Sequence, residues 1–221
     1  MAPPLALDID GTLTTEREAV DPRAFEVLPE WGAPIVLATG KAFPYPVALA
    51  HFVGIPERVI AENGGVVLVD DEVTYAGDPE RVREAVDAFE ARGGSLGWGG
   101  ADTVNRWRET EVAISRDADG DLLRAVADEY DLDLIDSGYA YHLKSGDVEK
   151  GDGLRRVAAA LGLDPGEFVA VGDSENDAST FAMAGRSFAV ANADAVAREA
   201  ADVVLDAPRM DGTLAALDAV R

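Results

Sequence analysis

Near its N-terminus the chain reads Leu5-Ala6-Leu7-Asp8-Ile9-Asp10-Gly11-Thr12-Leu13-Thr14, a short apolar run that ends in two acids and a glycine. Such a run, stopped by turn-forming residues, is typical of a strand buried within a parallel sheet. In open parallel sheets, ligands bind beyond the carboxyl ends of the strands, which is where Asp8 and Asp10 fall. The stretch therefore predicts a parallel-sheet core with two carboxylates at its binding edge.

The remainder of the chain alternates short apolar runs with amphipathic stretches, which predicts an α/β fold with a largely parallel sheet. Asp21-Pro22 and Asp78-Pro79 each supply an N-cap and a first-turn proline, so a helix is expected at each pair. The core strands are expected at residues 5–9, 34–38, 58–61, 168–171, 187–190 and 202–205, with a hairpin over 66–69 and 73–75. The core helices are expected at 22–31, 47–53, 154–161 and 214–220 and directly after 177.

The segment between residues 80 and 148 differs in character from the rest of the chain. Its elements are expected to be a helix that ends near 92, a strand around 106–114, a helix over 122–130 and strands over 132–136 and 139–143. Helix, strand, helix and hairpin are the content of a compact α+β unit. We therefore expect residues 80–148 to be a small domain inserted into a core made of residues 1–79 and 149–221.

Composition and charge limit the classes of protein and partner. Hydrophobic residues make up 48% of the 221 residues, enough for a large buried core. The 42 acids outnumber the 19 bases, for a formal net charge of −23, which disfavours nucleic acid as a partner because its binding requires bases that neutralise phosphates. Like charges repel each other unless salt screens them, so we expect a host with high internal salt. An ordinary acidic cytosolic protein is the alternative.

Two absences in the sequence narrow the setting further. The chain has no cysteine, so disulfides and thiolate metal sites are excluded. No apolar run approaches the roughly 18 to 20 residues that cross a bilayer, and the residues before Asp8 lack the basic segment and long apolar run of a signal peptide. We expect a soluble cytoplasmic protein that binds no membrane, and the sequence leaves the oligomeric state open.

A second acidic stretch, Gly172-Asp173-Ser174-Glu175-Asn176-Asp177, follows another expected strand. Asp173 and Asp177 can join the two N-terminal carboxylates as oxygen ligands of a hard cation. The same residues suit a helix N-terminus, where carboxylates cap the first turn and favour the positive end of the helix dipole. Asp-x-Asp pairs also recur in this acidic chain, so the residues by themselves leave both interpretations open.

Two segments that contain a lysine suggest a phosphate site. Thr39-Gly40-Lys41 follows the second core strand and precedes a helix, so its hydroxyl and N–H groups can hold a phosphate oxygen. Lys150 lies in the first turn of another expected helix, where its charge opposes the helix dipole. A phosphoryl group bound there would explain this placement.

The chain resembles the haloacid dehalogenase superfamily, whose four motifs correspond to D-x-D-G-T-L-T at 8–14, T-G-K at 39–41, K-G at 150–151 and G-D-S-E-N-D at 172–177. Residues 61–65, 190–193 and 200–204 resemble the subgroup with a type-2 cap between the second and third motifs. The resemblance implies a Rossmann-like parallel-sheet core with an inserted α+β cap. It also implies a magnesium-dependent phosphatase that acts on a small phosphorylated metabolite.

The resemblance implies a role for each matching residue. Asp8 is expected to attack phosphorus and form an aspartyl-phosphate, and Asp10 to act as general acid and base. The phosphoryl group is expected to be held by Thr39, Gly40, Lys150 and Asn176, and Mg²⁺ by Asp8, the main chain of Asp10, Asp173 and Asp177. Lys41 stands where the family often has arginine, so no role follows for it.

The substrate expectation comes from residues 108–114 and 136–143, which resemble the caps of archaeal phosphoglycolate phosphatases. This resemblance implies hydrolysis of 2-phosphoglycolate to glycolate and phosphate. A phosphatase for a sugar phosphate or a phosphoglycerate derivative is the first alternative. A phosphomutase or phosphotransferase is the second, and a phosphate-binding module without activity is the third.

The carboxylate of such a substrate needs a cationic or N–H-rich partner, which the cap has to supply. The candidates are Arg106, Arg108 and Arg116, and Arg106 and Arg108 would share one face of the expected strand. Pairing of these arginines with cap acids alone is the competing interpretation. Of the two histidines, we expect His51 to be packed in a core helix, whereas His142 lies on a cap strand that can line the site.

Overall fold

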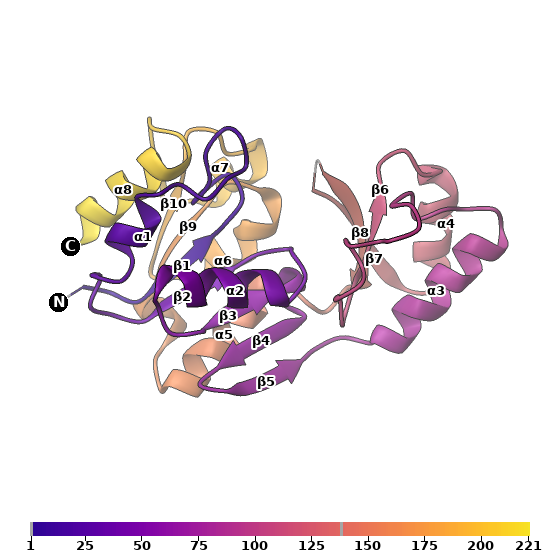
Figure 1. Ribbon diagram of the computed structural model, residues 1–221, viewed down its shortest axis with the longest axis horizontal. Coiled ribbons are helices and arrows are strands. Elements are labelled where there is room, and N and C mark those ends of the chain that lie inside the picture. The colour runs from indigo at the N-terminus through magenta and orange to yellow at the C-terminus, as the bar shows by residue number, and fades with distance from the viewer. Residues whose placement is uncertain (1, 138) are drawn as a thin grey trace.

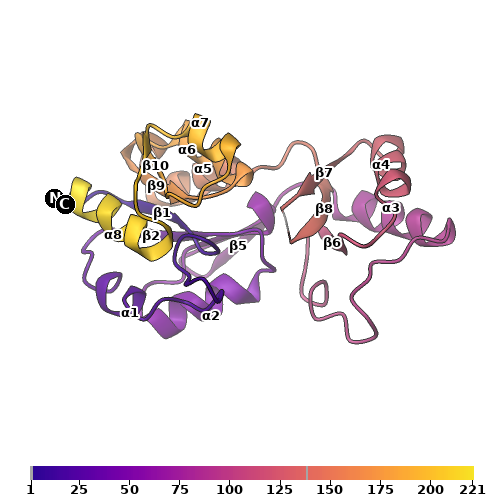
Figure 2. The same ribbon diagram turned by 90° about the horizontal axis from the view of Figure 1, so that it is seen from above.

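The computed structural model describes residues 2–137 and 139–221 and consists of two units joined by two chain segments (Figure 1). The larger unit, which we call the core, is a sheet with helices on both faces (Figures 1 and 2). The smaller unit, which we call the small module, has its own sheet beside the core. The expected α/β fold with a largely parallel core sheet is confirmed. None of the helices in the described part of the chain is long and apolar enough to span a membrane.

Within the described residues, the core sheet has eight strands in the order β11-β10-β9-β1-β2-β3-β4-β5. They are β1 (Leu5–Asp8), β2 (Ile35–Ala38), β3 (Val59–Ala61), β4 (Val66–Val69), β5 (Glu72–Tyr75), β9 (Val169–Gly172), β10 (Arg186–Ala189) and β11 (Val203–Val204). The strands from β11 to β3 run parallel, and β4 and β5 add an antiparallel hairpin at one edge. Since β1 pairs with both β2 and β9, it is an interior strand. Asp8, at its carboxyl end, therefore lies near the middle of the row of strand ends where ligands bind.

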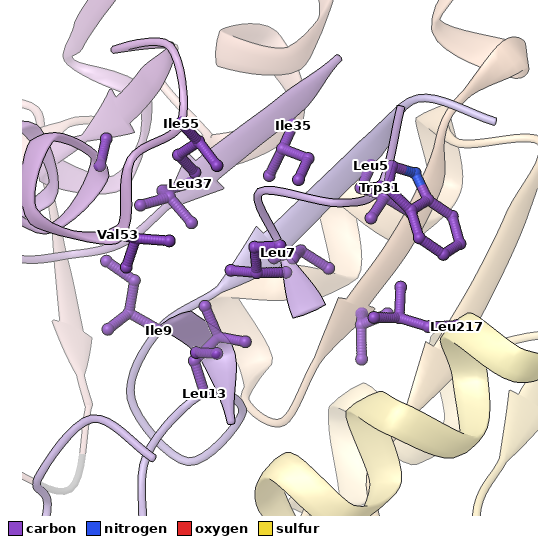
Figure 3. Packing of buried hydrophobic residues seen from close by; sticks show 14 of the residues in the cluster. Leu5, Leu7, Ile9, Leu13, Trp31, Ile35, Leu37, Val53, Ile55 and Leu217 are labelled. Carbon is purple, nitrogen blue, oxygen red and sulfur yellow. The ribbon is translucent and has the colours of Figure 1, made fainter. Parts of the chain in front are cut away.

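The side chains of β1 alternate between two apolar clusters, which places this strand at the centre of three layers. Leu5 and Leu7 pack into the cluster that Figure 3 shows, whereas Ala6 contributes to the cluster on the opposite face. The first face is covered by α1 (Ala24–Val27), α2 (Pro44–Val53) and α8 (Arg209–Val220), and the second by α5 (Lys150–Leu161), α6 (Ala178–Met183) and α7 (Ala195–Ala200). Full burial of a leucine stabilises a fold by about 1.5 to 3 kcal/mol, so these clusters fix the end of β1 firmly.

The small module is a two-layer unit. Its elements are α3 (Pro79–Ala91), β6 (Val112–Ser115), α4 (Gly120–Glu129), β7 (Leu132–Asp136) and β8 (Ala140–Ser145). The strands form an antiparallel sheet in the order β6-β8-β7. Phe89, Leu123 and Leu143 belong to the apolar cluster between this sheet and its helices. The sheet lies between those helices and the core, so its other face is turned towards the core (Figures 1 and 2).

The expected strand around 106–114 is wrong over most of its length, because β6 comprises only Val112–Ser115. Residues 103–107 form turns instead, after Asp102 with its left-handed φ of 32°. The side-chain amide of Asn105 donates to the carbonyl of Ala113 at 2.9 Å and accepts from its N–H at 2.8 Å. A side chain thus occupies the place of a neighbouring strand, so Arg106 and Arg108 do not share a strand face.

Another expected element is shorter than predicted. The helix expected over 22–31 has only the four residues of α1. The domain boundaries at 79/80 and 148/149 remain a prediction, although α3 begins at Pro79 and α5 at Lys150.

Candidate active site

Two acidic loops meet at the binding edge of the core sheet. Asp8 ends β1, and Asp173 follows β9, the strand beside it. Gly11, in the loop after β1, has a left-handed φ of 79°, and a Cβ at this position would lie 1.8 Å from Oδ2 of Asp173. Only glycine allows the first loop to pass this close to the second.

Asp177 organises the second acidic loop. Its Oδ2 accepts hydrogen bonds from the N–H groups of Asp173 at 3.0 Å and Ser174 at 3.1 Å. Ser174 and Asp177 form a capping box on the short turn η3 (Glu175–Asp177). Helix capping, one of the two interpretations left open by the sequence, is therefore realised here, and it holds Asp173 beside Asp8.

Lys150 lies beneath the two loops, where its side chain is fully buried. Its Nζ donates to Oδ1 of Asp8 at 2.8 Å and to Oδ1 of Asp177 at 2.7 Å. Burial alone would lower the pKa of Lys150, but the carboxylates of Asp177 and Asp8 raise it above its ordinary value. Lys150 therefore remains a cation that links the ends of β1 and η3 to the first turn of α5.

One lysine does not neutralise this group of acids. Burial raises the pKa of Asp8 well above its ordinary value, and Asp177 and Asp173 add to the effect, while Lys150 opposes it. Burial and Asp177 likewise raise the pKa of Asp173 to about 7. One oxygen from each of the three carboxylates lies within 4.8 Å of the other two. Buried carboxylates at such separations repel each other unless a cation lies between them.

This geometry fits a hard divalent cation. Oδ2 of Asp8 is buried and has no hydrogen-bond partner among the described residues. Both oxygens of Asp177 already accept hydrogen bonds, so Asp8 and Asp173 offer the freer ligand atoms. A site whose side-chain ligands are all carboxylate oxygens suits Mg²⁺. The side chain of Asp10 is 45% exposed, lies outside the group of three, and pairs with Lys41 at 3.2 Å.

A cleft of about 500 Å³ lies over these loops. Its lining includes six of the predicted site residues, namely Asp8, Asp10, Thr39, Gly40, Asp173 and Asn176. The other two, Lys150 and Asp177, are not part of the lining and lie buried behind it. Thr39 follows β2, and its Oγ1 accepts the N–H of Lys41 at 3.1 Å, which shapes the turn after that strand.

The small module supplies the opposite wall of the cleft with Arg108, Ser137, Tyr139 and His142. Arg108 forms a buried ion pair with Glu111, and its Nη1 donates to the carbonyl of Gly40 at 3.0 Å. Nδ1 of His142 lies 2.9 Å from Oε1 of Glu111, and its Nε2 lies 3.2 Å from Oγ of Ser137. Glu111 thus holds two basic side chains at this wall.

The charge of Glu111 is well compensated. Burial by itself would raise its pKa, but His142 and Arg108, together with hydrogen bonds from His142 and Asn63, lower the pKa of Glu111 to about 2. Nδ2 of Asn63 donates to Oε2 of Glu111 at 2.8 Å, while Oδ1 of Asn63 accepts from Asn176 at 2.9 Å. A chain of polar side chains therefore connects the small module with the second acidic loop.

Several residues of the site received no role from the sequence. Asn63 and Glu111 fall in the family-like stretches 61–65 and 108–114, but their contact with each other and that of Glu111 with His142 join distant positions. Arg209 lines the cleft from the start of α8. Among the expected arginines only Arg108 lines the cleft, and Arg116 pairs instead with Asp136 at 3.1 Å.

The two histidines differ in burial. The expectation that His51 is packed is wrong, because its side chain is 70% exposed. His142 is buried and lines the cleft.

A family model described as haloacid dehalogenase-like hydrolase matches residues 5–118 and 121–217. A protein of Halorubrum lacusprofundi named phosphoglycolate phosphatase is 65% identical, with 100% of this chain and 98% of that protein covered. A protein of the same name from Natronomonas pharaonis is 53% identical, with 100% and 99% covered. A solved structure from Thermoplasma acidophilum has a TM-score of 0.83 at 25% identity and covers 96% of this chain and 95% of that one. The matched ranges include both acidic loops and the cleft wall of the small module.

Proposed function

The chain belongs to the haloacid dehalogenase-like hydrolase family and is a phosphatase, and we propose that its substrate is 2-phosphoglycolate, which it hydrolyses to glycolate and phosphate. The names of two relatives that match over their full length support this substrate. Both relatives come from halophilic organisms, in agreement with the net charge of −23. We also infer that the enzyme works in a cytoplasm of high salt.

The observation that carries the proposal is the pairing of two unlike walls across one cleft. The core wall has the carboxylate of Asp8, the proposed nucleophile, with Lys150 behind it. The wall of the small module has Arg108 and His142. In 2-phosphoglycolate a single methylene group separates the phosphate ester from a carboxylate, so one molecule can meet both walls. Nε of Arg108 donates to the carbonyl of Val104, and its Nη1 donates to Gly40 and Glu111, so Nη2 is proposed to donate to the substrate carboxylate. An uncharged sugar offers no such charged acceptor.

The bases of the cleft favour an anionic substrate once a cation offsets the acids beside them. The lining contains three bases and four acids, namely Lys41, Arg108, Arg209, Asp8, Asp10, Glu18 and Asp173. The proposed Mg²⁺ would offset part of the acidic charge, and the bases would then attract an anion. Phosphoglycolate carries negative charge at both ends, whereas a sugar phosphate carries it only on its phosphate, so phosphoglycolate gains more from these bases.

In the proposed reaction, a carboxylate oxygen of Asp8 attacks phosphorus and an aspartyl-phosphate forms. The Asp10 carboxyl group gives a proton to the departing glycolate oxygen and later takes one from the water that releases phosphate. Asp10 suits this exchange because its side chain reaches the cleft and is not part of the buried carboxylate group. Thr39, Gly40 and Asn176 face the same space and are proposed to hold the phosphoryl oxygens, while Lys150 compensates the charge of Asp8.

We propose Mg²⁺ as the cofactor, held by Asp8, Asp173 and the main chain of Asp10, with Asp177 alongside. The partnerless Oδ2 of Asp8 and the raised pKa of Asp173 support a cation at this point. When bound, Mg²⁺ supplies positive charge that stabilises the phosphoryl group during transfer.

The test is a panel of phosphate esters, assayed at high KCl with Mg²⁺. We expect kcat/KM to be highest for 2-phosphoglycolate and much lower for ethyl phosphate, which lacks the carboxylate, and for glucose 6-phosphate. Glycolate and phosphate should be released in equal amounts even when an alcohol is added as a competing acceptor. Equal or better hydrolysis of glucose 6-phosphate would contradict the substrate, and phosphate transfer to the alcohol would contradict hydrolysis.

A further inference from the structure

Glu62 is a buried acid that has no part in the proposed reaction. It follows β3 at the start of the short turn η1 (Glu62–Gly64) and is only 1% exposed. Its Oε2 accepts hydrogen bonds from N of Thr110 at 2.7 Å, Oγ1 of Thr110 at 2.8 Å and N of Glu109 at 3.0 Å. Its Oε1 lies 3.1 Å from the same N–H of Glu109. Every one of these donors belongs to the small module, so the carboxylate of a core residue binds that module to the core.

The burial of the Glu62 carboxyl group and its left-handed backbone both cost free energy. Burial raises the pKa of its carboxyl group, and the hydrogen bonds from Thr110 and Glu109 act against this rise. Within the described part of the chain, no base lies within ion-pair distance of Glu62. Its φ is 52° and that of Asn63 is 53°, a left-handed backbone that costs a non-glycine residue roughly 1 to 2 kcal/mol. Strain and burial of this kind point to a position that is set by function.

Glu109 and Thr110, which Glu62 binds, lie in sequence between Arg108 and Glu111 of the cleft wall. Arg108 directly precedes Glu109, and Glu111 directly follows Thr110. Glu111 in turn forms the ion pair with Arg108 and contacts Nδ1 of His142. A shift of Glu109 and Thr110 would therefore move the whole basic group of the small module.

Neighbouring contacts hold the same segment from the core side. Asn63, next to Glu62, donates to Glu111 at 2.8 Å. Gly65 lies so close to the small module that a Cβ there would be 1.9 Å from Oγ1 of Thr110. Glu62 and Asn63 thus bind two neighbouring positions of the segment 109–111, and Gly65 allows the core to approach it closely.

We propose that Glu62 is a positioning residue for substrate selection: by fixing Glu109 and Thr110, it keeps Arg108 and His142 opposite Asp8. This inference rests on the proposed function, because the group that is held in place is the one that binds the substrate carboxylate. Loss of Glu62 should harm substrates that carry a carboxylate and spare those that do not.

The first experiment compares Glu62→Gln with the wild type on 2-phosphoglycolate and ethyl phosphate. The variant keeps the size of the side chain but turns an NH₂ group towards N–H donors. Loss of hydrogen bonds to a charged acceptor predicts a rise of about tenfold or more in KM for phosphoglycolate, while kcat/KM for ethyl phosphate stays within about threefold. Thr110→Val removes one donor of the same set and should give a smaller change in the same direction.

The matched control is Asp202→Asn. Oδ2 of Asp202 accepts from N of Ser187 at 2.8 Å and from Oγ of Ser187 at 3.0 Å, the same pattern that Thr110 offers to Glu62. This pair lies within the core, away from the cleft lining. Asp202→Asn should leave the ratio of kcat/KM for the two substrates unchanged, even if it lowers the melting temperature.

A second measurement does not depend on the substrate. Amide hydrogen exchange in a peptide that covers residues 109–112 should be slow in the wild type and at least about tenfold faster in Glu62→Gln, because the protecting carboxylate acceptor is lost. The same peptide should keep wild-type exchange in Asp202→Asn. Unchanged exchange in Glu62→Gln would show that Glu62 does not hold the segment.

The outcomes separate the two proposals. If the wild type does not prefer phosphoglycolate over ethyl phosphate, the proposed function is wrong. If the wild type does prefer it, but Glu62→Gln lowers kcat/KM for both substrates by the same factor, or for neither, the positioning role is wrong. If Glu62→Gln does not fold, as judged by circular dichroism at high salt, the ratio in Thr110→Val decides the question.

Discussion

The two walls of the cleft hold their charged groups in different ways. On the core wall, Asp8 and Asp173 stand at the ends of adjacent parallel strands, and Asp177 receives backbone N–H groups of its own loop. On the wall of the small module, Arg108 and His142 are held by a side chain, Glu111, which depends on Asn63 of the core. The first wall is built from local backbone geometry, and the second from contacts between distant segments. We therefore expect the core wall to carry the reaction and the other wall to carry the choice of substrate.

Removal of the nucleophile tests the core wall and should have the largest effect. Asp8→Asn should lower kcat by about 10⁴-fold or more on every substrate, since an amide cannot attack phosphorus. The fold should persist, with an unchanged circular dichroism spectrum at high salt. Asp202→Asn, which alters an acid outside the cleft, serves as the control and should keep wild-type turnover. Turnover by Asp8→Asn within tenfold of the wild type would rule out Asp8 as the nucleophile.

Metal removal also acts on the core wall. An excess of chelator should abolish hydrolysis of phosphoglycolate and ethyl phosphate alike, and added Mg²⁺ should restore both. Asp173→Ala removes a charged oxygen ligand, so it should raise the Mg²⁺ concentration for half-maximal activity by about tenfold or more. Magnesium titrations of wild type and variant would measure this shift. Full activity in chelator, with metal content checked, would contradict the assignment.

The wall of the small module predicts a pH-dependent contribution to stability. The pKa of Glu111 in the folded chain, about 2, is lower than its ordinary value of 4.5. The stabilisation is therefore complete above about pH 5 and decreases as pH falls towards 2, and the full difference corresponds to about 3 kcal/mol. Glu111→Gln should lose about this much unfolding free energy at pH 7. In denaturant titrations, the difference in unfolding free energy between variant and wild type should decrease from about pH 5 to pH 3. A difference that does not depend on pH would refute this contribution.

The smallest expected effect concerns the surface outside both walls. If the net charge of −23 is screened in a saline cytoplasm, the melting temperature should rise by about 5 to 10 °C between about 0.1 M and 2 M KCl. Differential scanning calorimetry at several salt concentrations would measure the rise. A melting temperature that stays constant or falls would favour the ordinary acidic protein instead.

The contrast between the walls also explains how much could be predicted from the sequence. The apolar run at 5–8 and the acids after it follow strand and turn rules that act over a few residues, and the structure places six of the eight predicted site residues on the cleft lining. Lys150 and Asp177 lie behind the lining, where Lys150 pairs with both Asp177 and Asp8. Local patterns indicate which residues lie near the site, but not which of them face the ligand.

The second wall could not be predicted in the same way. Strand periodicity placed Arg106 and Arg108 on one face, whereas the side chain of Asn105 replaces the strand neighbour and this segment forms turns. Arg108 is only three residues from Glu111, but the contacts of Glu111 with His142 and Asn63 form only in the folded chain. No periodic pattern encodes contacts between positions as distant as these two are from Glu111.

The division of labour between the walls can be measured directly with one variant from each. Thr39→Ala on the core wall should lower kcat/KM for phosphoglycolate and ethyl phosphate by the same factor, about tenfold or more, because both share the phosphoryl group. Arg108→Ala should lower the value for phosphoglycolate by about a hundredfold and leave that for ethyl phosphate within about threefold, since only the first has a carboxylate. Arg106→Ala, an exposed arginine outside the cleft lining, should match the wild type on both. If Arg108→Ala lowers kcat/KM for both substrates by the same factor, the small module does not select the substrate through this residue, and the central claim is wrong.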